Sequence, residues 1–165
     1  MSPAISTATQ VHRVVIKAPA EKIWQALTDP DFTRRYGYGS PSFYELRPGG
    51  SFRVEPTEGM RAHGAPDTII DGEVVECDPP RRLVQTWHAH FSSELAAEPA
   101  NRLTWEIEDE PGSPGLCRLT VTHELDGAPV TAISVAGENP NAGGGWPYIL
   151  SDLKTFLETG DNMGG

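Results

Sequence analysis

The chain has 165 residues, enough for one domain that buries about 70% of the surface its unfolded form would expose. Apolar residues make up 38% and charged residues 22%, while 17 Gly and 15 Pro favour turns and hairpins over a helix bundle. Thirteen Lys and Arg against 23 Asp and Glu give a net charge of -10, which disfavours binding to nucleic acid or to an anionic membrane. No run approaches the roughly 18 apolar residues of a membrane span, and the N-terminus does not resemble a secretory signal. We therefore expect a single cytoplasmic domain.

The first ordered elements are expected to be a strand and a helix. Residues 1–10 are small and polar, and we predict that they are disordered. Residues 11–18 alternate apolar and charged side chains, which predicts a strand. Residues 19–29 begin with a proline and carry an apolar stripe at helical spacing, so a short amphipathic helix follows. One more helical turn with Phe32 and Tyr36 is expected before glycines end it.

The middle of the chain predicts three hairpins. Short β-prone runs flank the turns "RPGG", "DPP" and "EPGSPGL", which gives hairpins over 42–56, 67–91 and 101–125. Together with the first strand they make seven strands. The following segment, 126–142, is ambiguous, and we expect a loop that can include one helical turn.

The last element is predicted most clearly. Apolar residues repeat at intervals of three and four between 146 and 157, and Gly160 stands where a helix C-terminal cap belongs. Three glycines, 143–145, precede this helix. They suggest either a hinge that lets Trp146 close over a cavity, or simply a tight turn with Trp146 fixed in the core.

These elements predict an α+β fold in one domain, residues 11–160, with a flexible tail at 161–165. Hairpin connections favour a single antiparallel sheet, and seven short strands are too few to cover both faces as a sandwich. Both helices must therefore bury their apolar stripes on one face of that sheet.

Five stretches carry a resemblance to a known family. "IKAPAEKIWQALTDP", "RPGGSFR", "GEVVECDPPRRLVQTW", "LTVTHEL" and "GWPYILSDLKTFLETG" occur in this order between residues 16 and 160. Together they resemble the bacterial proteins related to activators of heat-shock protein 90 (Hsp90) ATPase, within the START-like (SRPBCC) superfamily. No single stretch is specific, but their order is.

The resemblance implies a helix-grip fold, as in START and birch-pollen-allergen domains. In that fold a long C-terminal helix lies across a seven-stranded curved antiparallel sheet, a short N-terminal helix region packs beside it, and a deep cavity lies between helix and sheet. In relatives the cavity holds lipids, sterols, polyketides or other apolar molecules. Some members of the superfamily are cyclases or hydrolases.

The candidate binding residues are mainly aromatic, because a ligand cavity of this type is mostly apolar with few polar anchors. Strand parity puts Trp87, Trp105 and His123 on the faces that should look toward the helices. For each aromatic residue alone, filling a solid core is the more common role, but as a set they favour a pocket. The ligand-binding set that we predict is Trp24, Phe32, Tyr36, Phe43, Phe52, Trp87, Trp105, His123, Trp146 and Leu150.

Three histidines are candidates for a chemical role. His123 could hydrogen-bond to a ligand or act as a general base, or it could be a core histidine bonded to its neighbours. His88 and His90 share one strand face, but on the parity opposite Trp87, and spacing indicates no third metal ligand. We therefore predict no metal, no cofactor and no catalytic residue.

The sequence thus favours binding of a small hydrophobic molecule between the C-terminal helix and the sheet. Two alternatives stay open: an enzyme of the polyketide cyclase or hydrolase type, and a co-chaperone that stimulates an Hsp90 ATPase. The co-chaperone is less favoured because the START-like domain begins by about residue 11, without the separate N-terminal domain of eukaryotic activators.

Overall fold

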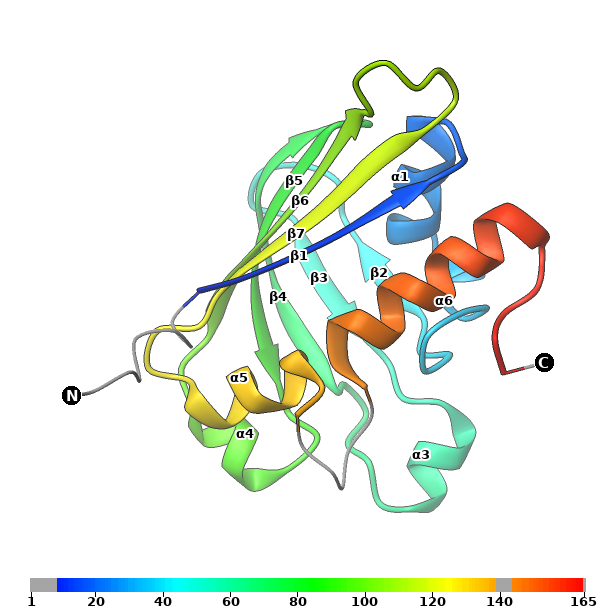
Figure 1. Ribbon diagram of the computed structural model, residues 1–165. Helices are drawn as coiled ribbons and strands as arrows, with labels where there is room; N and C mark the ends of the chain where they lie inside the picture. The colour runs from blue at the N-terminus through cyan, green and yellow to red at the C-terminus, as the bar shows by residue number, and fades with distance from the viewer. Residues whose placement is uncertain (1–8, 139–143, 165) are drawn as a thin grey trace.

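The computed structural model describes residues 9–138 and 144–164. These ranges contain seven strands and six helices, joined by loops (Figure 1). Among them, no helix is both long and apolar enough to cross a membrane. In chain order the elements are β1 (Thr9–Ile16), α1 (Ala20–Thr28), α2 (Pro30–Thr33), β2 (Ser42–Tyr44), β3 (Ser51–Val54), α3 (Glu58–Ala62), β4 (Ile70–Asp78), β5 (Arg82–Ala89), α4 (Ser93–Ala97), β6 (Asn101–Asp109), β7 (Cys117–Glu124), α5 (Pro129–Ala136) and α6 (Gly145–Thr159).

The strands form one antiparallel sheet in the order β1-β7-β6-β5-β4-β3-β2. Strands that follow one another in the chain pair as hairpins, and the last strand, β7, also pairs with the first strand, β1. A register shift between Val74 and Glu76 marks a bulge in β4. The sheet curves, and α6 lies across its open side with α1 near one end and α5 near the other (Figure 1). This is the helix-grip architecture, so the predicted α+β class and the seven strands are confirmed.

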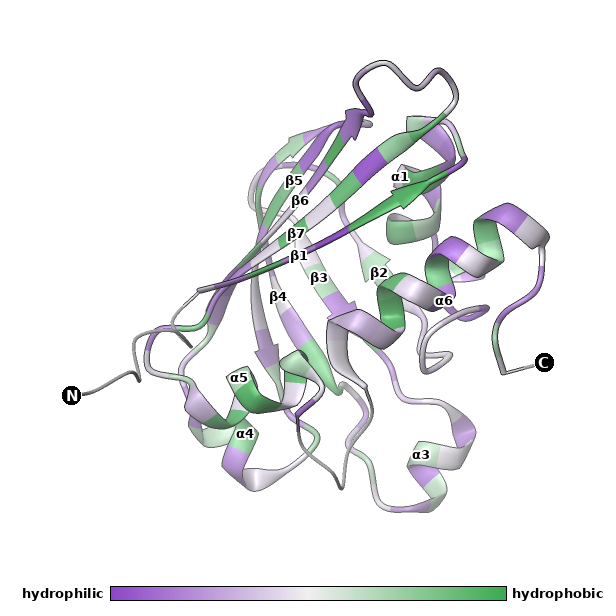
Figure 2. Ribbon diagram, viewed as in Figure 1, coloured by the Kyte–Doolittle hydropathy of each residue, from purple (hydrophilic) through white to green (hydrophobic). Residues whose placement is uncertain are grey.

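The core lies between the inner face of the sheet and the helices. Every second residue is buried from 101 to 107 in β6 and from 117 to 123 in β7, as the pleat of a strand requires, and Thr104 and Thr120 are buried as well. Hydrophobic and hydrophilic residues alternate along β7, whereas β1 ends in a hydrophobic stretch and α5 is hydrophobic over most of its length (Figure 2). The largest fully buried apolar side chains are Ile16, Ile23, Leu83, Leu103, Ile107, Leu119, Leu153, Val74, Val84 and Val121.

The segment expected as a loop contains a helix instead. α5 begins with a proline at its first position and ends at Gly137, which takes the left-handed conformation. The Glu98 carboxylate accepts hydrogen bonds from the backbone N–H groups of Val130 and Thr131 at 2.8 Å each, and so satisfies free donors at the start of the helix. The short helices α3 and α4, in the loops after β3 and β5, were also not predicted.

The start of α6 packs closely against the end of α5. Gly145 has φ 65°, and a Cβ atom there would collide with the backbone oxygen of Val135 and the nitrogen of Gly137. Only glycine allows this approach. Of the hinge proposed for 143–145, Gly143 lies outside the described residues, so the hinge stays a hypothesis.

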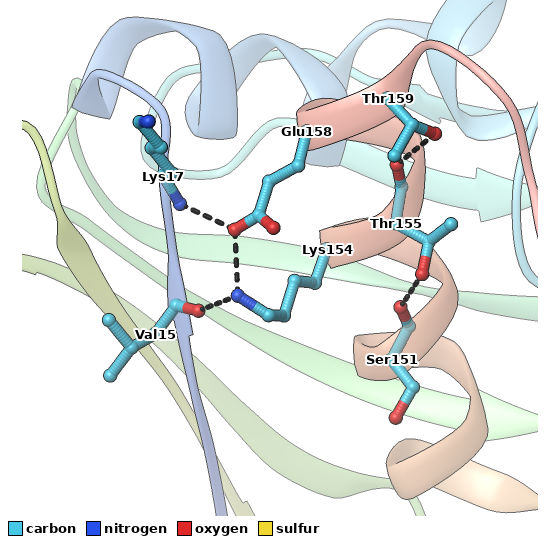
Figure 3. Close-up of polar contacts among 7 residues, drawn as sticks. All are labelled: Val15, Lys17, Ser151, Lys154, Thr155, Glu158 and Thr159. Atoms are coloured by element: carbon cyan, nitrogen blue, oxygen red, sulfur yellow. Dashed lines mark hydrogen bonds and ion pairs between the residues drawn. The ribbon is translucent and has the colours of Figure 1, made fainter.

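Polar contacts fix the other end of α6 to β1. The Lys154 ammonium donates hydrogen bonds to the backbone oxygen of Val15 and to the Glu158 carboxylate, each at 2.7 Å (Figure 3). The same carboxylate accepts from the backbone N–H of Lys17 at 2.7 Å. These bonds hold the last turns of the helix against the edge strand.

The segment after α6, expected as a flexible tail, also makes contacts. The buried Asp152 carboxylate accepts hydrogen bonds from the backbone N–H groups of Gly37, at 2.7 Å, and Met163. The Asn162 side chain donates to the backbone oxygen of Arg35 at 2.9 Å. Asp152 therefore joins three segments that are far apart in the sequence.

Candidate functional site

A cavity of about 420 Å³ lies between α6 and the inner face of the sheet. This volume falls in the usual range for small-molecule sites, about 300–1,000 Å³. Tyr38 and Phe91 line it and are 43% and 48% exposed, so they mark its mouth. The remaining lining residues are Leu27, Thr33, Tyr36, Gly37, Ser40, Ser42, Tyr44, Phe52, Val54, Met60, Ile69, Ile70, Trp87, Leu103, Trp105, Ser134, Val135, Gly145, Trp146 and Ile149.

Half of the predicted binding set lines this cavity. Trp87 and Trp105 face it from the neighbouring strands β5 and β6, and Trp146 faces it from the first turn of α6. The rings of Trp105 and Trp146 meet edge to face with centroids 5.3 Å apart. Tyr36 and Phe52 complete the group, which gives the cavity a largely aromatic wall.

The other five predicted residues do not line the cavity. Trp24 and Leu150 are buried in the core, 8% and 3% exposed. Phe32 packs edge-on against Phe156 of α6, and the Phe43 ring lies under the Arg53 guanidinium. The fifth residue is His123.

His123 lies behind the aromatic wall and is fully buried. Trp146 can only donate from its Nε1, which is 3.1 Å from His123 Nδ1, so Nδ1 accepts and the ring proton is on Nε2. That Nε2–H donates to the Asn101 side-chain oxygen. Burial, with a smaller effect of His12, lowers the pKa of His123 to about 3, so the ring is neutral. Both ring nitrogens are therefore bonded to other side chains of the protein. Of the two roles that the sequence left open, this arrangement fits a core histidine rather than one that contacts a ligand.

Two tyrosines anchor the inner wall. The Tyr36 hydroxyl donates to the backbone oxygen of Ala26, and the Tyr44 hydroxyl donates to the Gln85 side-chain oxygen, each at 2.8 Å. Burial raises the pKa of both tyrosines, so they stay protonated and keep donating. Gln85 is fully buried, and within the described ranges its side-chain nitrogen has no hydrogen-bond partner.

Tyr38 supplies a polar group at the mouth. Its hydroxyl oxygen accepts a hydrogen bond from the backbone N–H of Gly145 at 3.1 Å, and its ring stacks on Tyr148 with centroids 5.4 Å apart. These two contacts fix the ring against the start of α6. The hydroxyl hydrogen has no acceptor among the residues that the structure describes, and so it can serve a guest molecule.

The cavity wall carries no charge. Among the described residues, no Lys, Arg, His, Asp or Glu lines the cavity. The residues outside the described ranges contain none of these types either. An ionised group inside would therefore lose its hydration without gaining a counter-charge, which is strongly unfavourable.

Several lining residues were missed from the sequence. Ile149 and Leu150 lie three and four residues after Trp146 on α6, so helical spacing puts both on one stripe and does not show which of them lines the cavity. Tyr38, Met60 and Phe91 come from loops or the short α3, where no periodic pattern indicates direction.

Comparison with known proteins agrees with this geometry. The family model described as activator of Hsp90 ATPase homolog 1-like protein matches residues 17–158. No curated protein matches the chain.

Several solved structures share the fold. The solution structure of CalU16 from Micromonospora echinospora is 24% identical with a TM-score of 0.64, over 95% of this chain and 69% of that one. DynU16, from the dynemicin biosynthetic locus, is 24% identical with a TM-score of 0.67, over 94% of this chain and 49% of that one. The Aha1 dimer from Colwellia psychrerythraea gives 18% identity and a TM-score of 0.59, over 92% and 97%.

At these identities the likeness shows the fold alone, and this chain spans about half the length of DynU16. The family match is broader evidence, because it covers most of the sequence from the end of β1 to the last turn of α6. The chain therefore belongs to the activator of Hsp90 ATPase homolog 1-like family, within the START-like superfamily.

Proposed function

We propose that the protein binds a neutral, largely apolar small molecule in the cavity under α6. The observation that carries this proposal is a volume of about 420 Å³ lined mainly by aromatic and aliphatic side chains, with no charged group among the lining residues that the structure describes. A solid core would fill such a space, since voids larger than a water molecule are few in protein interiors.

Polarity narrows the class of guest. A carboxylate or ammonium group would have to leave water without a counter-ion, whereas a hydroxyl or carbonyl needs only one hydrogen bond. The Tyr38 hydroxyl hydrogen is placed to supply that bond at the mouth, to an oxygen of the guest. A sterol, polyketide or other polycyclic molecule with one or two oxygens fits these requirements.

Tryptophan emission provides the assay. Three of the four tryptophans line the cavity, and Trp24 does not, so a guest should change the emission of the protein. The purified chain is titrated with panels of neutral sterols, polyketides and fatty alcohols. Saturable binding of at least one neutral class supports the proposal, and its absence from every class contradicts it.

A matched pair of variants localises the binding. Ile149→Trp places a larger side chain into the cavity from α6 and should lower the affinity at least tenfold. Leu157→Trp makes the same change two turns later on the same helix, at a residue that does not line the cavity, and should leave the affinity within about twofold. Equal loss in both variants would place the guest elsewhere.

The two alternatives from the sequence have less support. An enzyme would need a base or nucleophile at the cavity. His123, the candidate general base, lies behind Trp146 with both ring nitrogens bonded. The co-chaperone role rests on the description of the family and on fold likeness. Turnover of a bound guest, or stimulation of a cognate Hsp90 ATPase by the purified chain, would favour one of these alternatives.

A further inference from the structure

A second cluster of side chains lies on the outer face of the sheet, away from the cavity. Asp71 of β4 and His88 of β5 are directly opposed in the antiparallel register, and His90 follows two residues after His88 on the same face. One ligand atom from each of these three residues lies within 4.8 Å of the other two. Strand pairing thus supplies the third ligand that spacing along the sequence could not indicate.

From this cluster we infer that the protein binds a divalent transition-metal ion such as Zn²⁺. Two imidazoles and one carboxylate suit zinc, nickel or copper, whereas Mg²⁺ and Ca²⁺ prefer oxygen ligands alone. Tetrahedral zinc ligands are roughly 3.4 Å apart, given Zn–N and Zn–O distances near 2.1 Å. The three ligand atoms lie within 4.8 Å of one another, so the side chains would have to rotate toward one another to hold the ion.

The surroundings of His88 prepare it for this role. Its Nε2 is 3.1 Å from the backbone oxygen of Ala96 in α4, and a carbonyl oxygen can only accept, so Nε2 carries the proton. The Nδ1 lone pair is then free for a cation. A histidine that donates its other N–H to a backbone carbonyl is the usual arrangement around bound metals, because it fixes the ring and its tautomer.

The other two ligands are accessible and already in contact. His90 Nε2 is 2.9 Å from the Asp71 carboxylate, and their side chains are 28% and 53% exposed. Arg53 of β3 is opposite Asp71 in the register, but its guanidinium is bonded to Glu55 at 3.2 Å and lies over the Phe43 ring. Asp71 therefore has His90 as its close partner, and an ion would insert between the two, leaving an open position for water.

Metal binding is tested on the untagged, metal-free chain. Zn²⁺ is titrated by calorimetry, and Co²⁺ is used to record the visible spectrum that distinguishes imidazole ligation from the hydrated ion. One equivalent of tightly bound metal is expected, with a rise in the melting temperature on Zn²⁺ addition, since an ion that binds the native state stabilises it.

Three single variants decide whether these residues hold the ion. His90→Gln and Asp71→Asn keep side-chain size and hydrogen bonding, and each should lower the Zn²⁺ affinity at least tenfold and abolish the melting shift. His63→Gln is the control, because His63 is exposed and bonds locally to Gly59. Loss of affinity in the control to the same degree, unchanged affinity in His90→Gln and Asp71→Asn, or no Zn²⁺ binding by the wild type would each overturn the inference.

Discussion

Replacing His123 by Gln should change how the stability of the protein depends on pH. In the folded protein His123 is fully buried and neutral, because burial, helped by His12, lowers its pKa to about 3. In the unfolded chain the same ring has an ordinary pKa of about 6.5. Between these values the unfolded state binds a proton that the folded state does not. Stability is therefore complete above about pH 6.5 and is lost as the pH falls toward 3.

The size of the effect follows from the difference in pKa. A pH of 5 is about 1.5 units below the pKa of the imidazole in the unfolded chain. Protonation then stabilises the unfolded state by about 2 kcal/mol, and the folded protein loses that much stability. Glutamine can accept from Trp146 and donate to Asn101 as His123 does, but it does not titrate. The variant should therefore not lose this roughly 2 kcal/mol when the pH is lowered to about 5, whatever its stability at neutral pH.

Urea unfolding of wild type and His123→Gln at pH 7.5 and pH 5.0 measures the effect. Carboxylates and the other histidines contribute to both proteins, so the difference between the two proteins isolates His123. The wild type should lose about 2 kcal/mol more than the variant over this interval. A difference that stays constant within about 0.5 kcal/mol would refute the reasoning. In NMR spectra, the His123 ring resonances of the folded wild type should not titrate between pH 5 and 8.

Three other predictions use the same kind of comparison. Gly145→Ala should lower the free energy of unfolding by at least about 2 kcal/mol, because alanine is strained at this φ and its Cβ collides with Val135. Gly49 has φ 84° but open space around it, so Gly49→Ala should lower the free energy by only about 1 kcal/mol. Urea unfolding measures both. Burial alone would raise the pKa of Glu98, but hydrogen bonds from Thr131 and Val130 outweigh it and lower that pKa. Glu98→Gln should therefore cost about 1 kcal/mol at pH 7, and this loss should disappear as the pH falls through the lowered pKa of the wild type. In the emission assay, decan-1-ol should bind at least tenfold more tightly than decanoate, and equal affinities would contradict burial of the guest's polar group in the uncharged cavity.

The sheet and the final helix were predictable because their signals are local. Alternating side chains in β6 and β7 and turn residues between strands fix the hairpins, and Gly160 ends α6 at φ 88° as expected. α5 was not predictable in the same way. It is apolar on most sides, so it shows no helical stripe, and its N-terminal donors are satisfied by Glu98 about 30 residues earlier in the chain.

The candidate site was predictable only where strand parity decides direction. Parity placed Trp87 and Trp105 correctly toward the helices, but it could not show that His123, on the same inner surface, lies behind them. On α6, spacing defines a stripe that meets both core and cavity, so Leu150 and Ile149 could not be separated. The position of Asp71 opposite His88 depends on the register between two strands, which the sequence of either strand alone does not determine.

The bonds that join Lys154 and Glu158 to the edge strand bear on how the cavity could be adapted. They hold the C-terminal end of α6, the end away from Trp146, against the sheet, and Asp152 also bonds α6 to the turn at Gly37. Changes of guest during evolution, or by design, would then disturb the fold least in the part of the rim formed by Met60 and Phe91, which lies outside these bonds, while α6 and the sheet keep their positions. Libraries restricted to that rim should therefore alter selectivity with little loss of folded protein.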